Sequence, residues 1–183
     1  MHYNLGNALY LNETTDEAVK HYYAAIAIVS DKAETHYNLG NALCVSSKYE
    51  EAATAYEKAV ELDPQNAPAF YNLGNALYML NRLEDCVQRY QQALSLNSES
   101  PECHFNLASA CNDLGQRNEA IKHYQFAIGL DNDNVDAHLC LGAVFQEAQD
   151  YDKASQAFEN VLKIDPENAK AQDYLGRLKA GNH

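Results

Sequence analysis

Residues 2–9 read H-Y-N-L-G-N-A-L, and the same eight letters return unaltered at residues 36–43. Related stretches begin at intervals of 34 residues: F-Y-N-L-G-N-A-L at 70–77, H-F-N-L-A-S-A-C at 104–111 and H-L-C-L-G-A-V-F at 138–145. A second block follows each copy at a fixed distance, with a small residue and then an aromatic one: Ala18 and Tyr22, Ala52 and Tyr56, Cys86 and Tyr90, Ala120 and Tyr124, Ala154 and Phe158. A period of about 20–50 residues is typical of a stacked repeat array. The sequence therefore predicts five such repeats.

Each repeat has the apolar spacing of two amphipathic helices joined by a short turn, because residues such as Leu39 and Leu43 recur at helical intervals. First helices are expected near 2–11, 34–46, 68–80, 102–114 and 136–148, and second helices near 16–28, 50–62, 84–96, 118–130 and 152–164. Gly40 and its equivalents lie in mid-helix, where glycine costs about 1 kcal/mol against alanine. We expect the close approach of two helix backbones to compensate for this cost.

The period also predicts how the chain is divided. The repeats are expected near 1–32, 33–66, 67–100, 101–134 and 135–168, followed by a capping helix at 169–180, all in one array. Met1 directly precedes a residue that is already well inside the first repeat. We therefore expect the chain to be a fragment of a longer protein.

Composition excludes several classes of function. The formal net charge of the 183 residues is −13, which disfavours nucleic acid and anionic membrane surfaces, since both need clustered lysine and arginine. No apolar run is long enough to span a bilayer. The cysteines are odd in number and form no C-x-x-C pair: Cys44, Cys86, Cys103, Cys111 and Cys140. Such cysteines are typical of a reducing, intracellular setting, so we expect a cytoplasmic protein.

The sequence shows no motif for catalysis or for binding a cofactor or metal. It contains no phosphate-binding loop, paired carboxylates or catalytic triad, so we expect neither an enzyme nor a cofactor. The repeated histidines lie one or two periods apart on separate repeats: His2, His36, His104 and His138. They cannot converge on one metal ion, and we expect them to pack between helices.

The order of aromatic residue, Leu-Gly, Ala-x3-aromatic and proline resembles the tetratricopeptide repeat over essentially the whole chain. The N-L-G-N wording is also similar to the repeat arm of O-linked N-acetylglucosamine transferase, although it lies close to the family average. The resemblance implies an all-α, right-handed superhelical solenoid that binds extended peptides in its concave groove. Some co-chaperone members clamp a terminal carboxylate with lysine and asparagine on the first helices. The corresponding places here hold Tyr3, Tyr37, Tyr71, Asn38 and Asn72. We therefore expect no binding of chaperone tails.

Helix geometry predicts which face binds. At roughly 100° per residue, Leu39 and Leu43 point to one side of their helix, and Asn38 and Asn41 point to the opposite side. Repetition extends these asparagines into two rows: Asn4, Asn38, Asn72 and Asn106, and beside them Asn7, Asn41 and Asn75. Asparagine amides match the N–H and C=O groups of a peptide backbone, which indicates a peptide groove; merely polar surface is the alternative. Replacing Asn38, Asn41, Asn72 and Asn75 by alanine should then weaken peptide binding and barely change thermal stability.

Other candidate binding residues lie beside these rows. Tyr37 and Tyr71 flank them, and we expect these rings to pack on a neighbouring helix with hydroxyls that reach the groove. In the first three repeats the groove is mixed and partly apolar, with Leu11, Val45, Met79 and Pro68 beside Glu34. It then carries four acidic residues with no basic groove neighbour before Lys170: Glu102, Asp113, Asp136 and Glu147. This change favours a ligand with an apolar segment and a basic segment, unless the acids only maintain solubility.

The sequence thus predicts a protein–protein interaction module that binds an extended peptide in an asparagine-lined groove. Two alternatives remain. The chain could be the substrate-recruiting arm of a larger enzyme, or a structural scaffold that self-associates through its repeat ends.

Overall fold

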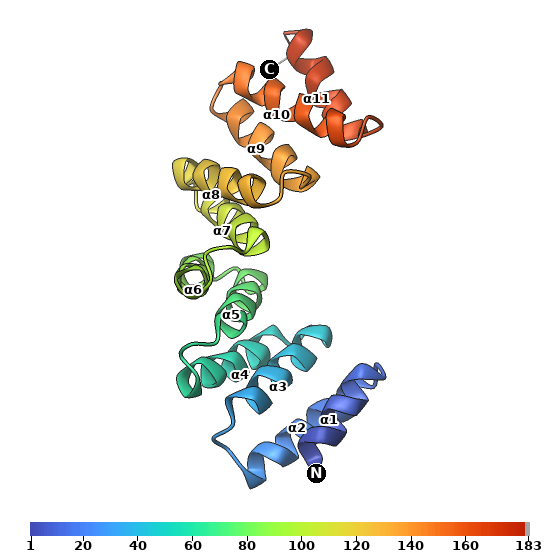
Figure 1. The fold of residues 1–183 in the computed structure, drawn as a ribbon, viewed down its shortest axis with the longest axis vertical. Coiled ribbons are helices and arrows are strands. Elements are labelled where there is room, and N and C mark those ends of the chain that lie inside the picture. Colours follow the sequence, from blue (N-terminus) through green and yellow to red (C-terminus); the bar gives the residue numbers. More distant parts are fainter. Residues whose placement is uncertain (182–183) are drawn as a thin grey trace. The chain divides into compact units, whose positions relative to one another are not determined.

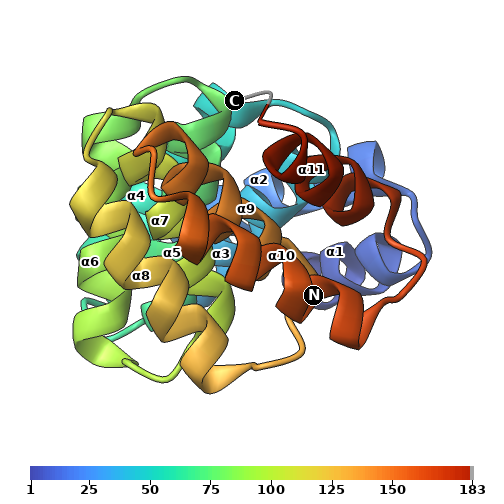
Figure 2. The ribbon, with the colours of Figure 1, turned by 90° about the horizontal axis from the view of Figure 1, so that it is seen from above.

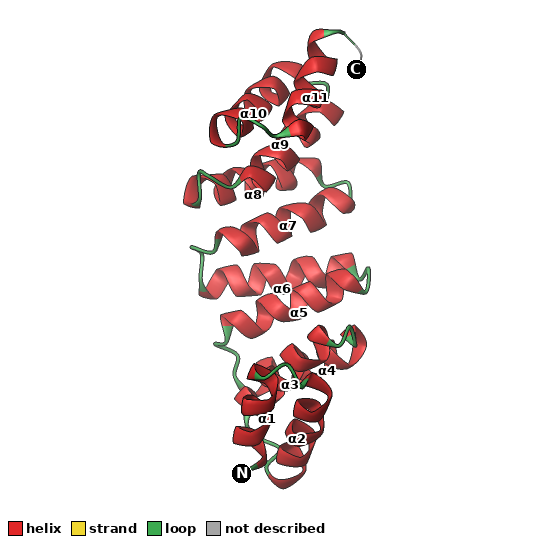
Figure 3. Cartoon of the chain, turned by 90° about the vertical axis from the view of Figure 1, so that its right-hand side faces the viewer, coloured by secondary structure: helices red, strands yellow, loops and turns green. Residues whose placement is uncertain are grey.

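A computed structural model describes residues 1–181, and over this range the chain forms eleven α-helices and no β-strand (Figure 3). The helices are α1 (His2–Leu11), α2 (Thr15–Ile28), α3 (Ala33–Val45), α4 (Tyr49–Leu62), α5 (Ala67–Met79), α6 (Leu83–Leu96), α7 (Pro101–Asp113), α8 (Arg117–Leu130), α9 (Val135–Glu147), α10 (Tyr151–Ile164) and α11 (Ala169–Lys179). The all-α fold expected from the period is confirmed. Within residues 1–181, no helix combines the length and the apolar character needed to cross a lipid bilayer.

The chain divides into two compact units, the first from Met1 to Ser98 and the second from Glu99 onward. The first unit contains α1 to α6 and the second contains α7 to α11. Within each unit, every helix packs on the next one in the chain, as Figure 1 shows from the side and Figure 2 from above. The first helices of neighbouring repeats also touch, α1 with α3, α3 with α5, and α7 with α9. First helices therefore form a continuous row inside each unit.

Side-chain caps fix where several first helices begin. The side chains of Asn66, Ser100, Asn134 and Asn168 each accept a hydrogen bond from the backbone N–H three residues later. These four residues are spaced by the repeat period, and an N-cap of this kind is worth about 1 kcal/mol. The repeat therefore encodes the helix starts as well as the buried face.

The buried face is the one that helix geometry predicts. Leu39 and Leu43 are at most 3% exposed, and His36 is also buried. Ala52 and Tyr56 on α4 close the other side of the same core. The largest fully buried side chains include Tyr22, Tyr56, Tyr90, Leu73 and Leu77 in the first unit, and Leu107, Cys111, Phe158 and Val161 in the second.

The mid-helix glycines make room for aromatic rings. A Cβ atom built on Gly40 would lie 2.5 Å from a ring carbon of Tyr56, and the aromatic rings of the second helices crowd Gly6, Gly74 and Gly142 in the same way. Our expectation that two helix backbones would meet here was wrong, because the ring of the second helix fills the space. Ala108 takes this place in the fourth repeat, where it is fully buried.

Helix α11 is the last helix of the described residues, and its sequence follows the pattern of a first helix. The ring of Tyr174 stacks on Phe158 of α10 with centroids 4.7 Å apart. Gly176 corresponds to Gly40 in the repeat, yet a Cβ atom built on it would meet nothing within 4 Å. The outward positions Gln172, Asp173 and Arg177 are exposed. These side chains give α11 a polar outer face.

Candidate functional site

The asparagines of the first unit are bonded to tyrosines of the second helices. The Tyr56 hydroxyl donates to Oδ1 of Asn41 at 2.7 Å, and Tyr90 donates to Asn75 at the same distance. Tyr22 donates to Asn7 at 2.8 Å. Sequence reasoning had placed these amides away from the second helices, whereas each one receives the hydroxyl of a nearly fully buried tyrosine.

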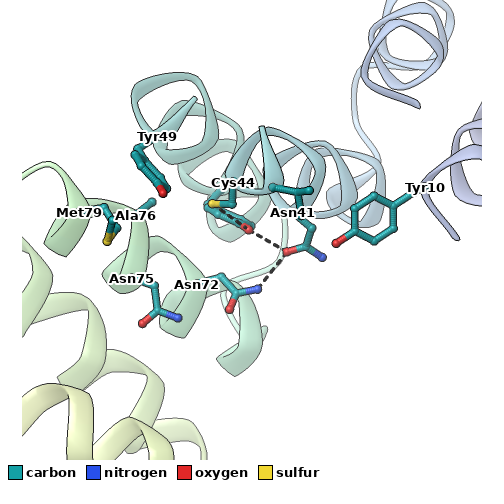
Figure 4. A pocket seen from close by; sticks show the side chains of 10 residues that line it. Tyr10, Asn41, Cys44, Tyr49, Asn72, Asn75, Ala76 and Met79 are labelled. Carbon is teal, nitrogen blue, oxygen red and sulfur yellow. Dashed lines mark hydrogen bonds between the residues drawn. The ribbon is translucent and has the colours of Figure 1, made fainter. Parts of the chain in front are cut away.

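The two asparagine rows are also bonded to each other from repeat to repeat. Nδ2 of Asn72 donates to Oδ1 of Asn41 at 3.0 Å and to the hydroxyl of Tyr37 at 3.2 Å. Nδ2 of Asn38 makes the same pair of bonds, to Asn7 at 3.2 Å and to the hydroxyl of Tyr3 at 3.1 Å. We call these bonded groups together the amide network: Asn7, Asn38, Asn41, Asn72 and Asn75 with Tyr3, Tyr22, Tyr37, Tyr56 and Tyr90. Figure 4 shows the Asn41–Asn72 bond within this network. The network ties neighbouring first helices together.

Four of these asparagines, Asn7, Asn38, Asn41 and Asn72, each keep one polar group available. Among residues 1–181, Nδ2 of Asn7 and Asn41 has no bonding partner, and neither has Oδ1 of Asn38 and Asn72. In these bonds, each Oδ1 atom of Asn7 and Asn41 accepts from two donors. Asn7 and Asn41 therefore present donors, and Asn38 and Asn72 present acceptors.

The flanking tyrosines contact the second helices. The rings of Tyr37 and Tyr56 lie 6.0 Å apart and are tilted, and those of Tyr71 and Tyr90 lie 5.9 Å apart. Tyr37 and Tyr71 are half-buried. Burial raises the pKa of Tyr22 to about 12 and that of Tyr56 further still. The phenols of Tyr22 and Tyr56 therefore stay protonated donors across the physiological range.

A hollow of about 290 Å³ opens beside the amide network, and Figure 4 shows it from close by. Four helices contribute its lining: α1 gives Tyr10; α3 gives Asn41, Cys44 and Val45; α4 gives Tyr49 and Tyr56; and α5 gives Asn72, Asn75, Ala76 and Met79. None of these residues is charged. Burial raises the pKa of the Cys44 thiol, so it is also neutral at physiological pH. Val45 is 63% and Met79 57% exposed, so apolar surface lies open at the edge of the hollow.

The remaining predicted residues lie as follows. Asn4 is exposed on α1, and Asn106 is half-buried on α7. In the second unit, Ser109 stands where the first unit has Asn41, and its hydroxyl lies 3.0 Å from that of Tyr124. Glu102, Asp113, Asp136 and Glu147 are all exposed. Nη2 of Arg117 lies 3.8 Å from Oε2 of Glu147. Our expectation that no basic residue neighbours these acids before Lys170 was therefore wrong.

The repeated histidines pack between helices. Nε2 of His36 lies 2.9 Å from the carbonyl oxygen of Ser30. Nδ1 of His104 lies 3.0 Å from Nδ1 of His123, and the two rings stack. Within residues 1–181, no three side chains of His, Cys, Asp or Glu lie close enough together to hold a metal ion.

The stacked pair of His104 and His123 predicts a measurable pH dependence. Burial lowers the pKa of His123 to about 4, aided by His104 and Lys122 and opposed by Glu119. Because an unfolded histidine titrates near 6.5, the unfolded chain binds a proton between these values that the folded chain does not. The free energy of unfolding should thus fall as the pH drops from about 6.5 to about 4, by less than the roughly 3 kcal/mol of the full shift, because solvent partly screens this group.

Chemical denaturation at several pH values compares the wild type with His123→Ala. Alanine stands at the corresponding place in the second and fifth repeats, as Ala55 and Ala157, so the substitution suits the fold. The variant should lose less stability on acidification than the wild type. Equal losses would show that His123 does not titrate in this range.

The sequence matches models of a known protein family. The family model described as "TPR repeat" matches residues 6–45, 40–81, 74–111 and 108–149, and the one described as "Tetratricopeptide repeat" matches residues 135–168. No curated protein sequence matches the chain.

Several solved structures are similar. The crystal structure of YrrB, described as "a TPR protein with an unusual peptide-binding site", is 25% identical, with a TM-score of 0.86, over 94% of this chain and 89% of that one. A crystal structure of MamA is 23% identical, with a TM-score of 0.87, over 90% and 96% of the two chains. PilF of Pseudomonas aeruginosa is 19% identical, with a TM-score of 0.77, over 98% and 88%. The last two likenesses concern the fold alone.

Proposed function

The chain belongs to the tetratricopeptide repeat family, and on that premise we propose that it is a protein–protein interaction module that binds an extended partner segment along the first helices of its first unit. The observation that carries this proposal is the alternation of unused groups in the amide network. Asn7 and Asn41 offer donors, and Asn38 and Asn72 offer acceptors. YrrB, with its described peptide-binding site, supports a function of this kind.

The binding free energy that the amides can supply indicates that other side chains must contribute. Four unused amide groups at about 1 kcal/mol each give about 4 kcal/mol, which corresponds to millimolar affinity. Micromolar binding needs about 8 kcal/mol, so the amides alone do not suffice. Exposed apolar side chains beside them can supply the remainder: Leu11, Val45 and Met79. The bound segment is thus expected to carry apolar side chains.

The second unit offers a different surface. Its exposed acids, Glu102, Asp113, Asp136 and Glu147, favour a basic segment of the same partner, although Arg117 partly neutralises Glu147. The five free cysteines support a reducing, cytoplasmic setting for the interaction. Attachment to a catalytic domain would make the chain a recruiting arm, with the same surfaces in use.

A scaffold that self-associates is the second candidate. Leu5 of α1 is 44% exposed, whereas the corresponding Leu39 is 3% and Leu73 is 0% exposed. The outer face of α1 therefore leaves open an apolar contact that later repeats close. Sedimentation velocity over a range of concentrations separates this candidate from a monomeric peptide binder.

Chaperone tails should not bind. A carboxylate clamp needs cations on the first helices, and the positions concerned hold Tyr3, Tyr37, Tyr71, Asn38 and Asn72. A peptide ending in Glu-Glu-Val-Asp would also meet a protein with a net charge of −13. Fluorescence anisotropy in physiological salt should show no saturable binding at micromolar concentrations. Saturable binding of such a tail would contradict the assignment of these positions.

Selection from a phage-displayed library of random peptides tests the proposed function directly. The full chain should enrich extended, unstructured peptides, which should then bind as synthetic peptides. N-methylation of their central backbone amides should weaken binding, because it removes the N–H groups that would donate hydrogen bonds to the Oδ1 atoms of Asn38 and Asn72. Failure to enrich any peptide would overturn the proposal. So would equal affinities for a selected peptide and its N-methylated form.

A further inference from the structure

The hollow beside the amide network has a counterpart in the second unit that differs in charge. Two repeat periods further along the chain, Tyr49 corresponds to Arg117, Met79 to Glu147 and Val45 to Asp113. Arg117 and Glu147 lie within 3.8 Å of one another. The same place in the fold is therefore uncharged and apolar in the first unit, and is occupied by an ion pair in the second.

We infer that the hollow of the first unit is a specificity pocket that receives one uncharged, apolar side chain of the bound segment. This inference rests on the proposed function and adds to it the chemistry that the partner must carry. Asn41 and Asn72 line the hollow and also present unused backbone-binding groups. The backbone of the segment thus lies on the amides, and one side chain projects between Val45, Ala76 and Met79.

The size of the hollow limits its occupant. Its volume of about 290 Å³ is just below the range of about 300–1,000 Å³ that is typical of small-molecule sites. One side chain with the adjoining backbone suits such a space better than a cofactor does. Met79 is unbranched and flexible, and such a side chain adapts to irregular shapes. Leucine, isoleucine, methionine and phenylalanine are all therefore expected to be accepted.

Charge excludes the other residue classes. A lysine or glutamate side chain placed in the hollow would lose water and meet no opposite charge, because none of the ten lining residues is charged. An apolar side chain gains from the same loss of water. Full burial of such a side chain corresponds to roughly 10- to 100-fold in affinity. A single position of the partner should consequently dominate its sequence preference.

A substitution scan of a phage-selected peptide tests the inference. Synthetic versions carry leucine, alanine, lysine or aspartate at each position in turn, and their binding to the full chain is measured. One position should prefer leucine over lysine and aspartate by roughly 10- to 100-fold.

The second unit supplies the test variant. Val45→Asp with Met79→Glu installs the acidic residues of the second unit at two exposed positions, and should abolish the leucine preference without changing the thermal midpoint. The control, Thr54→Asp with Gln91→Glu, adds the same charge at exposed positions of the second helices α4 and α6, and should leave that preference intact. Retention of the preference in the Val45→Asp, Met79→Glu variant would overturn the inference while the proposed function stands. A wild type that binds no selected peptide would overturn both.

Discussion

Replacing Gly40 by valine should lower the free energy of unfolding by about 3 kcal/mol, because overpacking a rigid core typically costs about 1–3 kcal/mol. A Cβ atom at this position would lie 2.5 Å from one ring carbon of Tyr56 and 2.7 Å from another. Tyr56 cannot easily move aside, since it is only 1% exposed and its hydroxyl is bonded to Asn41. Valine adds two further methyl groups to this crowded point.

Gly176→Val is the matched control. Gly176 occupies the same repeat position on α11, where an added Cβ atom would meet nothing within 4 Å. Valine there should leave stability unchanged or raise it slightly, since it forms helices better than glycine. Gly40→Ala should fall between the two, because the fourth repeat accepts Ala108. Urea denaturation followed by circular dichroism gives all three values. Equal losses for Gly40→Val and Gly176→Val would contradict the ring-packing explanation.

Replacing Asn38, Asn41, Asn72 and Asn75 together by alanine should weaken binding of a selected peptide by several kcal/mol, at about 1 kcal/mol for each lost bond. From the sequence we expected that these substitutions would barely change thermal stability. The structure changes this expectation. Asn41 accepts the hydroxyl of buried Tyr56, and leaving such a donor without a partner costs about 1–3 kcal/mol. The alanine variant should therefore also unfold more easily.

Asn41→Asp separates binding from stability. Aspartate keeps an acceptor for Tyr56 and Asn72, but replaces the unused Nδ2 donor with a second acceptor. Binding should weaken, and the thermal midpoint should fall less than in the fourfold alanine variant, because the acceptor for Tyr56 and Asn72 is kept. Thr54→Ala, on the exposed side of α4, is a control that should change neither quantity. Unchanged peptide affinity in Asn41→Asp would remove Asn41 from the binding site.

The sequence predicts the helices and their buried faces well, because both follow from local periodicity. Leu39 and Leu43 had to share a side of their helix, and they are buried. The amide network could not be predicted in this way, since Asn41 and Tyr56 lie on different helices. A signal for it does exist: tyrosine pairs with Asn7, Asn41, Asn75 and Ser109, whereas phenylalanine, which has no hydroxyl, pairs with Ala143. Comparing repeats as pairs of positions would have shown the hydrogen bond.

The backbone conformation of the turns inside the repeats could not be predicted from the sequence either. One residue in each turn adopts a left-handed backbone, with φ between 56° and 73°, at Glu13, Ser47, Asn81, Gly115 and Gln149. Only one of these is glycine, the residue that accepts this conformation at no steric cost. The residue types at these positions therefore did not indicate a left-handed backbone, although the positions follow the repeat period.

Side-chain amide signals in nuclear magnetic resonance test the central claim most directly. The full chain, labelled with ¹⁵N, is titrated with a phage-selected peptide while the Nδ2 and Nε2 resonances are followed. We expect the side-chain signals of Asn7, Asn38, Asn41 and Asn72 to shift in a saturable manner, and those of Gln125 and Asn160 on the second helices α8 and α10 to stay in place. Shifts confined to the second-helix amides, with the four network asparagines unmoved, would contradict binding along the first helices.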